Sequence, residues 1–356
     1  MEKYWLPQRS MLDSPIALLK NFIYYVKHPI SRSTIEKETL EFPNFPNVSL
    51  ATYMQLLENW GVEQVAFKCE MENLKDIASP SILFITDDPE NKTEGEFVMF
   101  YEVKENNIEY LHTRKGWIIE TLEDFSKKFG KVAISAKSLK TKGEIDFEKK
   151  EKEYEEKKRT NPALKNVRVI DDFLTDKECE YIINLAQPIF KRSLVTGTEK
   201  DIVHEGRTSY TAGLDVFAKD EILLTIRMRA AELLNMPETH FEHFQCVSYD
   251  KTQELINHFD TFDETTERGK KIVEEKGQRK YTMLAYLNDD FIGGGTHFPN
   301  LDLLVQPKKR AVVIFNNLDD NGNVIPAAFH AGLPVTQGRK YAMNMWVCTK
   351  PCRKYN

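Results

Sequence analysis

Two histidines and one aspartate are the residues of this sequence whose types and spacing best fit metal chemistry. His258 and Asp260 are separated by one residue, and side chains at i and i+2 of a strand point to the same face. His330 follows later, in the segment AFHAGLPV. Two imidazoles and one carboxylate form the set that holds non-haem Fe(II) and leaves coordination positions open for a chelating co-substrate and dioxygen. The pattern therefore predicts an iron site.

An isolated His-x-Asp pair is a weak signal, because a surface histidine and a turn aspartate match it by chance. Two further residues favour the metal interpretation. Lys340 begins the strand-like run KYAMNMWV, where a buried ammonium would pair with the remote carboxylate of a co-substrate. Thr296 closes GGGT and offers a hydroxyl donor. The alternative for Lys340 is a solvated lysine at a strand edge.

The segments that must position these residues read as short strands. After Phe244, the runs FQCVSY, YTMLAYL, AVVIF and YAMNMWV alternate with turn-forming stretches such as DDNGN, which predicts a sandwich or small barrel. Before them we expect a strand at 167–170, a helix capped by Thr175 and an amphipathic helix from Asp220. The glycines at 293–295 predict a tight turn, since no GK[ST] follows them.

Composition and charge exclude several classes of protein. The 356 residues suggest two domains. With 49 basic and 55 acidic residues and a net charge of −6, the chain has the mixed balance that argues against a nucleic-acid binder. No apolar run is long enough to span a membrane, and the N-terminus does not read as a secretory signal. Five sparse cysteines suit a reducing compartment, so we expect a cytoplasmic protein.

One compositional break divides the chain. Residues 146–159 read DFEKKEKEYEEKKR, with Glu and Lys at the i,i+4 spacing that favours a solvated helix. Because this run carries both signs of charge, it predicts an exposed helical spacer and not a polyanion- or polycation-binding tail, which would carry a single sign. We place a charged helical linker at 141–162, between an N-terminal domain of residues 1–140 and a C-terminal domain of residues 163–356.

Over about residues 167–350 the sequence resembles the Fe(II)/2-oxoglutarate-dependent prolyl 4-hydroxylase family. The segment EGRTSYTAG is similar to the family's RTS loop, and VSYDKTQELINHFDTF is similar to its tyrosine-to-HxD segment. The segment RKYTMLAYLNDDFIGGGTHFPN is similar to the family's run that ends in GGxTxFP. The segment HAGLPVTQGRKYAMNMWV is similar to the part that carries its distal histidine, lysine and tryptophan. PKKRAVVIFNN matches another strand, with Arg310 where the family usually has glycine. The resemblance implies a double-stranded β-helix (jelly roll) with flanking helices.

The resemblance also implies a role for each matching residue. His258, Asp260 and His330 would ligate iron, and Lys340 would bind the far carboxylate of 2-oxoglutarate. The other implied site residues are Thr296 and Tyr249 beside the 2-oxoglutarate, Arg279 and Trp346 on the substrate side, and Arg207, Thr208 and Ser209 on a mobile loop over a peptide.

The implied enzyme is a 2-oxoglutarate-dependent dioxygenase. Its cofactors would be Fe(II), 2-oxoglutarate and O2, with ascorbate as a candidate reductant. The implied reaction is hydroxylation of a peptidyl proline at C4. The alternatives are hydroxylation of another side chain, of a free amino acid or of a small molecule.

The N-terminal domain carries an α+β pattern of its own. Helices are expected after Ser14 and after Ser49. The strand-like runs ILFIT, EFVMFYEV and IEYLH follow, and then come a turn at TRKG and a short helix, ETLEDFSKKF. The apolar face of the second helix is expected to comprise Leu50, Met54, Leu57 and Trp60.

This domain resembles the papain-like double-glycine leader peptidases. Gln8 and Asp13 match the oxyanion glutamine and the residue before the nucleophile. Ser14 stands at the nucleophile position, Glu96 at the histidine position and His112 at the aspartate position. Serine is far less acidic than cysteine, and Glu96 cannot replace the imidazole base. The resemblance therefore implies a catalytically dead pseudo-peptidase that binds a peptide. A rescued Ser14–His112 dyad and an unrelated structural domain are the alternatives.

Fusion of such a module to a hydroxylase suggests how a substrate is recruited. A ribosomally made precursor would dock its leader on the N-terminal domain, which raises the effective concentration of the core peptide at the iron site. Other candidate residues fall outside this scheme. Cys348 and Cys352 would be spare thiols, with a redox or zinc half-site as the alternative, and His240, His243 and His297 are expected to be structural.

Overall fold

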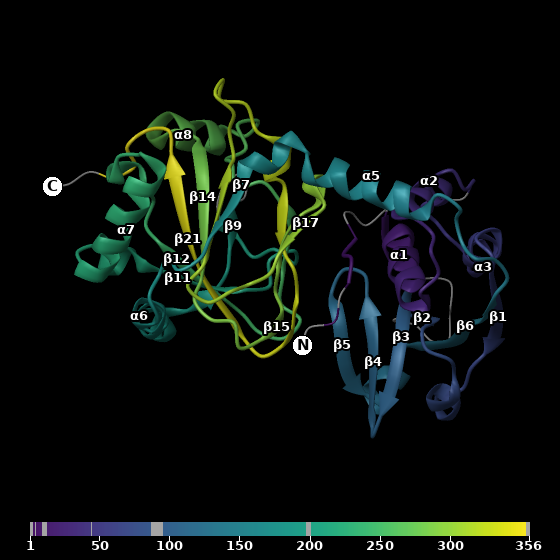
Figure 1. Ribbon diagram of the computed structural model, residues 1–356. Coiled ribbons are helices and arrows are strands. Elements are labelled where there is room, and N and C mark those ends of the chain that lie inside the picture. Colours follow the sequence, from purple (N-terminus) through teal and green to yellow (C-terminus); the bar gives the residue numbers. More distant parts are fainter. Residues whose placement is uncertain are drawn as a thin grey trace. The chain divides into compact units, whose positions relative to one another are not determined.

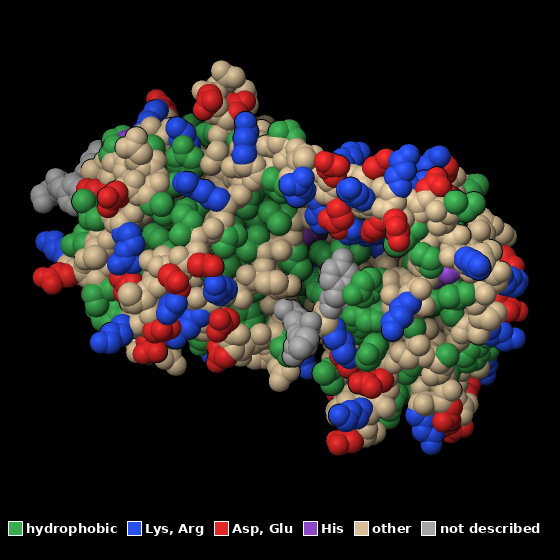
Figure 2. All heavy atoms as spheres, viewed as in Figure 1, with side chains coloured by type: hydrophobic (Ala, Val, Ile, Leu, Met, Phe, Trp, Pro, Cys, Tyr) green, Lys and Arg blue, Asp and Glu red, His purple; other side chains and the backbone are tan. Residues whose placement is uncertain are grey.

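The computed structural model describes residues 3, 5–8, 13–43, 45–86, 95–196 and 201–353. The chain divides into two compact units, Met1–Thr160 and Asn161–Asn356, whose elements are labelled in Figure 1. None of the helices formed by the described residues combines the length and the apolar character that a membrane crossing requires. On the face drawn in Figure 2, acidic and basic side chains are intermixed.

The first unit is built on a six-stranded antiparallel sheet in the order β1-β6-β2-β3-β4-β5. Because side chains alternate along a strand, Met99 packs in the core on one face of the sheet and Val98 and Phe100 pack in the core on the other. Both faces of this sheet are therefore buried. The strands are β1 (Val62–Lys68), β2 (Ser81–Ile85), β3 (Glu96–Lys104), β4 (Asn107–His112), β5 (Gly116–Thr121) and β6 (Phe129–Leu139).

Three helices cover one face of this sheet: α1 (Ser14–Val26), α2 (Arg32–Leu40) and α3 (Leu50–Asn59). The short α4 (Leu122–Ser126) packs on the other face through Phe125. All four residues predicted on the apolar face of α3 pack in the core between the three helices and the sheet: Leu57 and Trp60 are buried, and Leu50 and Met54 are partly buried against that core. Tyr53 and Leu56 are buried there as well, so the apolar face is wider than predicted.

The charged run forms α5 (Phe147–Arg159), but this helix does not stand free as a spacer. Glu151 accepts the backbone N–H of Arg32 at 3.0 Å and pairs with its guanidinium. Glu144, just before the helix, accepts the N–H of Ser31 at 2.9 Å. These carboxylates bind the N-terminal end of α2, where free N–H groups and the helix dipole favour negative charge. The helix therefore belongs to the first unit.

The second unit contains two antiparallel sheets. The larger has seven strands in the order β7-β18-β14-β21-β12-β11-β8, and the smaller has four in the order β13-β19-β16-β17. The strands of the larger sheet are β7 (Val167–Ile170), β8 (Lys191–Arg192), β11 (Tyr210–Gly213), β12 (Gln245–Tyr249), β14 (Arg279–Tyr286), β18 (Val312–Asn316) and β21 (Lys340–Cys348). Those of the smaller sheet are β13 (Leu255–His258), β16 (Thr296–Phe298), β17 (Leu303–Val305) and β19 (His330–Gly332).

Two short ribbons and three helices complete this unit. The ribbons pair β9 (Val195–Thr196) with β10 (Asp201–Ile202), and β15 (Ile292–Gly293) with β20 (Val335–Gln337). The helices are α6 (Asp176–Ala186), α7 (Glu221–Leu234) and α8 (Glu267–Lys276). Thr175 caps α6 in a capping box with Glu178, and Asp220 caps α7, as their sequences predict.

Alternation along β18 shows how the two cores of this unit form. Val313 and Phe315 pack with residues of the smaller sheet, whereas Val312 and Ile314 pack with residues of α6 and α7. The two sheets therefore face each other, and the helices cover the outer face of the larger one. This arrangement is consistent with the expected jelly roll.

Arg310, at the position where the resembled family has glycine, adopts a left-handed backbone with φ of 75°. That conformation costs a residue with a side chain about 1–2 kcal/mol. Its N–H bonds to the carbonyl of Tyr286 at 3.0 Å, and its guanidinium pairs with Asp172 and Asp176. Arginine in place of glycine at this position therefore affects a turn before β18 and not the predicted metal ligands.

Candidate functional site

The pairing of β13 with β19 brings the three predicted metal ligands together. His258 and His330 are direct partners in this antiparallel register, and their ring centroids lie 4.3 Å apart. The Asp260 carboxylate lies 3.6 Å from Nε2 of His258 and 3.8 Å from Nε2 of His330. One potential ligand atom from each residue lies within 4.8 Å of the other two.

Backbone carbonyls fix the orientation of both imidazoles. Nδ1 of His258 lies 2.8 Å from the carbonyl oxygen of Ile256, and Nδ1 of His330 lies 2.9 Å from that of Ala328. A carbonyl oxygen only accepts, so each Nδ1 carries the proton and each Nε2 presents a lone pair. Such outer contacts are typical of metal-binding histidines.

The carboxylate of Asp260 is held from the larger sheet. The hydroxyl of Thr282 on β14 donates to its Oδ2 at 2.7 Å, and Asn317 donates to that hydroxyl at 2.9 Å. Burial alone would raise the pKa of Asp260, but the neighbouring His258 and His330, together with Arg279, hold it well below its usual range. The residue is therefore an ionised carboxylate.

The protonation state of His330 complements that of Asp260. Burial, together with the neighbouring His258, lowers the pKa of His330 to about 4. Its imidazole is therefore neutral near pH 7. A neutral imidazole and an ionised carboxylate are the protonation states that bind metal ions.

Lys340 is buried, with 3% of its surface exposed. Its Nζ donates to the carbonyl oxygen of Gly294 at 2.5 Å and lies 5.4 Å from the ring centre of Tyr249. No carboxylate within the described ranges forms an ion pair with it, and burial lowers the pKa of Lys340 to about 7. The alternative of a solvated strand-edge lysine is therefore wrong. A buried ammonium without a counter-ion fits a site that receives a carboxylate.

The triad and Lys340 line one cavity of about 970 Å³ together with Thr296 and Tyr249. The hydroxyls of Thr296 and Tyr286 lie 2.7 Å apart, which fixes the position of both side chains. The strands that carry the lining residues are β12, β13, β16, β19 and β21, from both sheets, and Asp260 follows β13 directly.

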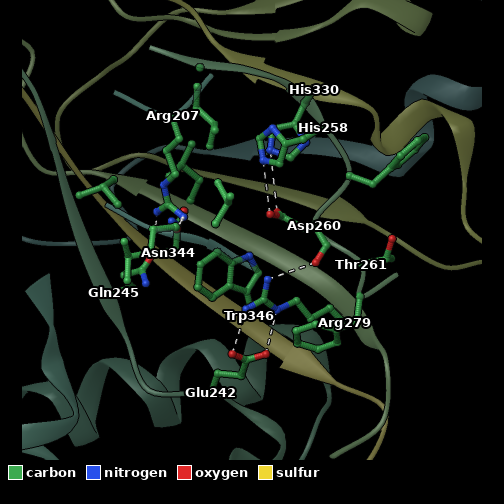
Figure 3. Close-up of a pocket in the computed structure, with 18 of the residues that line it drawn as sticks. Arg207, Glu242, Gln245, His258, Asp260, Thr261, Arg279, His330, Asn344 and Trp346 are labelled. Carbon is green, nitrogen blue, oxygen red and sulfur yellow. Dashed lines mark hydrogen bonds and ion pairs between the residues drawn. The ribbon is translucent and has the colours of Figure 1, made fainter. Parts of the chain in front are cut away.

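Arg279 and Trp346, which were expected on the substrate side, also line this cavity. The guanidinium of Arg279 lies 3.7 Å from the ring centre of Trp346 and binds Glu242 at 2.8 and 3.0 Å. Its remaining arm donates to the backbone oxygen of Asp260 at 3.1 Å. Figure 3 shows Arg279 and Trp346 side by side, between Glu242 and the triad.

The three residues expected on a mobile loop lie in different environments. Only Arg207 lines the cavity, where its guanidinium donates to Gln245 on β12 at 3.1 Å. Thr208 exchanges hydrogen bonds with the backbone of Glu254, and Ser209 is buried and bonded to Ser193. Thr208 and Ser209 therefore support the wall behind Arg207.

Sequence reasoning assigned no role to Glu242, Thr282 or Tyr286. Thr282 and Tyr286 lie inside the motif RKYTMLAYL, and their even spacing on β14 could have placed them on the inner face with Leu284. Glu242 had no such signal, because its contact with Arg279 joins residues far apart in the sequence. Burial opposes ionisation, but the charge of Arg279 prevails and lowers the pKa of Glu242 to about 2.

In the first unit, the structure joins Gln8 and Ser14 through Thr113. The Thr113 hydroxyl donates to Oε1 of Gln8 at 2.6 Å and lies 3.0 Å from Oγ of Ser14. A hydroxyl has one proton, so Ser14 is the donor in the second bond. The Ser14 proton is therefore directed at Thr113 and away from any imidazole.

His112 instead pairs with Glu96. Its Nε2 lies 2.9 Å from Oε1 of Glu96, and its Nδ1 accepts the N–H of Arg114 at 3.2 Å. Both ring nitrogens are engaged, so the alternative of a Ser14–His112 dyad is wrong. A Glu–His pair stands where the resembled peptidases have His and Asp, with the two residue types exchanged.

Comparison with known proteins identifies the second unit. The family model of the 2OG-Fe(II) oxygenase superfamily matches residues 244–348. A probable prolyl 4-hydroxylase 3 of Arabidopsis thaliana is 31% identical over 201 residues, which cover 50% of this chain and 68% of that protein. The chain therefore belongs to the 2OG-Fe(II) oxygenase superfamily. It is a 2-oxoglutarate-dependent dioxygenase, and its cofactors are Fe(II), 2-oxoglutarate and O2.

Two solved structures are similar to parts of the chain. A viral collagen prolyl hydroxylase of Paramecium Bursaria Chlorella virus-1 is 27% identical, covers 51% of this chain and 95% of its own, and has a TM-score of 0.40. A double-glycine motif protease from an AMS/PCAT transporter, in complex with a leader peptide, is 17% identical, covers 37% of this chain and 89% of its own, and has a TM-score of 0.32.

Replacing Lys340 with Met should separate stability from function. Unfolded lysine keeps its proton up to about pH 10.5 and buried Lys340 only up to about 7. The unfolded state therefore binds more protons between these values, and the free energy of unfolding should rise with pH by up to roughly 1.4 kcal/mol per unit. The Met variant should lose this slope and be more stable near neutral pH in denaturant titrations of the cofactor-free protein.

The same variant should no longer be stabilised by 2-oxoglutarate with Fe(II), whereas the wild type should be. Lys271→Met, at an exposed position on α8, is the matched control and should change neither property. A Lys340→Met protein that is less stable than wild type and still responds to 2-oxoglutarate would contradict the assignment of a vacant carboxylate partner.

Proposed function

We propose that this dioxygenase hydroxylates a prolyl residue at C4 in a peptide or protein. The observation that carries the proposal is the combination, in one cavity, of the His-Asp-His triad, the unpaired Lys340 and a wall that extends to Arg207 and Trp346. The name of the Arabidopsis relative supports the prolyl assignment. The residues that hold the cofactors occupy one part of this cavity, and the remaining wall is available to a substrate.

The side chains divide the work by position. Nε2 of His258, Nε2 of His330 and the carboxylate of Asp260 would hold Fe(II), and Lys340 would bind the far carboxylate of 2-oxoglutarate. With O2, this centre supplies the oxidation of an unactivated C–H bond. The protein holds the substrate against the centre and shields it from water.

Two polar residues on the cavity wall favour a peptide over a small apolar substrate. Arg207 and Trp346, which carry N–H donors, both line the cavity. The carbonyls of an extended backbone would accept hydrogen bonds from such side chains. Hydroxylation of another side chain or of a small molecule remains the second candidate.

We also propose that the first unit is a papain-like pseudo-peptidase that binds the leader of a precursor. The engaged nitrogens of His112 and the bond between Ser14 and Thr113 support the loss of peptidase chemistry. A groove that remains without a nucleophile would serve to recruit a substrate. A purely structural first unit is the alternative.

The hydroxylase proposal predicts both products of the reaction. Incubation with Fe(II), 2-oxoglutarate, O2 and proline-bearing peptides should yield succinate and peptides that gain one oxygen at proline, as mass spectrometry would detect. His258→Ala should lower both by at least about a hundredfold, because loss of an outer contact to a metal ligand already costs roughly 10–100-fold and this variant removes the ligand itself. Asp320→Asn, at an exposed position outside the cavity, is the control. Oxidation of free proline in preference to every peptide would count against the proposal.

The recruitment proposal predicts a change in KM when the first unit is deleted. Because α5 packs on that unit, the deletion should remove residues 1–160 and not stop before the helix. The truncated enzyme should show a higher KM for a full precursor, with kcat little changed, and should treat precursor and leaderless core alike. Such a precursor would be sought among short neighbouring reading frames.

Two outcomes would oppose this account of the first unit. Equal discrimination between precursor and core by the full-length and truncated enzymes would favour a structural role. Cleavage of a precursor by the full-length protein that disappears in Ser14→Ala would show that the unit is a working peptidase.

A further inference from the structure

One wall of the cavity is apolar and remains exposed. Leu194, Val195, Ile202, Ile256 and Phe259 all line it. The exposed fractions of Leu194, Ile202, Ile256 and Phe259 are 45%, 41%, 42% and 40%. Contiguous exposed apolar side chains beside polar groups mark binding surfaces more often than chance. We call these five residues the apolar wall.

Ile256 connects the apolar wall to the metal ligands. Ile256 lies two residues before His258 on β13, and both residues line the cavity. The N–H of Ile256 bonds to the carbonyl of Gly206 at 2.9 Å. A Cβ on Gly206 would lie 2.4 Å from Cδ1 of Ile256, so the glycine leaves the room that this side chain occupies.

The ribbon of β9 and β10 contributes Val195 and Ile202 to the apolar wall. Ile202 is the register partner of Val195, and the carbonyl of Leu194 accepts from Arg207 at 2.9 Å. The same cavity is also lined by the charged residues Glu242, Lys276 and Arg279, of which Glu242 pairs with the other two. A substrate in this cavity therefore meets both apolar and charged side chains.

We propose that the apolar wall binds a bulky aliphatic or aromatic side chain next to the hydroxylated residue and so sets the sequence preference of the enzyme. The inference rests on the peptide hydroxylase function proposed above and adds the class of its substrate. The wall is continuous with the metal ligands, so its occupant belongs to the same bound peptide. Burial of a leucine-sized side chain there should strengthen binding by about tenfold.

Short synthetic peptides test this inference. Each has a central proline in a glycine host and carries either leucine or the near-isosteric asparagine immediately before or after the proline. Anaerobic calorimetry measures Kd on the full chain loaded with Fe(II) and 2-oxoglutarate, and aerobic assays measure KM and kcat. For leucine in one of the two positions, Kd and KM should be about tenfold lower than for asparagine.

Two matched variants test whether the apolar wall causes the preference for leucine. Ile202→Asn, on the two-residue strand β10, should remove the preference for leucine. Ile292→Asn, on the two-residue strand β15 outside the cavity, is matched to it because the two isoleucines are 41% and 42% exposed. This control should keep the preference. Both variants should retain uncoupled succinate formation without peptide.

The outcomes separate this inference from the function on which it rests. If leucine and asparagine peptides bind equally and are hydroxylated equally, the peptide hydroxylase stands and the apolar wall has no role in specificity. If none of the peptides binds or is hydroxylated while uncoupled succinate still forms, the peptide hydroxylase proposal falls and the inference falls with it. Loss of the preference in Ile292→Asn as well would also overturn the inference.

Discussion

The antiparallel pairing of β13 with β19 is the constraint on which the rest of the site depends. It places His258 directly opposite His330, so two imidazoles from distant parts of the sequence lie next to one another. A slip of one residue would turn one of them to the other face of the sheet. Each ring is further fixed by the carbonyl two residues before it. The metal-binding atoms are therefore positioned by backbone geometry.

The larger sheet supplies the groups that hold Asp260 and the lysine that faces the co-substrate. Thr282 holds the carboxylate of Asp260, Arg279 holds its backbone, and Lys340 provides a cation deeper in the cavity. A buried ammonium without a counter-ion is unfavourable for folding, which is typical of a residue kept for binding. The facing sheets thus carry different halves of the site, and the packing between them sets its dimensions.

The residues that bind the metal and the co-substrate could be predicted from the sequence more completely than the residues that hold them in place. The types and spacing of His258, Asp260 and His330 suggested the triad once Lys340, Thr296 and the resemblance to prolyl 4-hydroxylases were added, and the strand around Lys340 suggested a buried partner for a carboxylate. Glu242 was missed because its bond to Arg279 arises from the packing of distant segments, which no local pattern encodes. The apolar face of α3 was predicted too narrow for a related reason, since packing against the sheet also buries Tyr53 and Leu56. Helix α5 was foreseen, but its contacts with the start of α2 were not.

The central claim is that this cavity holds Fe(II) and 2-oxoglutarate together. The most direct measurement is an anaerobic titration of the purified protein with both, followed by visible absorption. The account predicts a metal-to-ligand charge-transfer band that saturates at one Fe(II) per chain, requires 2-oxoglutarate and is absent from an Asp260→Ala variant of intact fold. A folded wild-type protein that gives no such band, or a variant that gives the same band as wild type, would contradict the account.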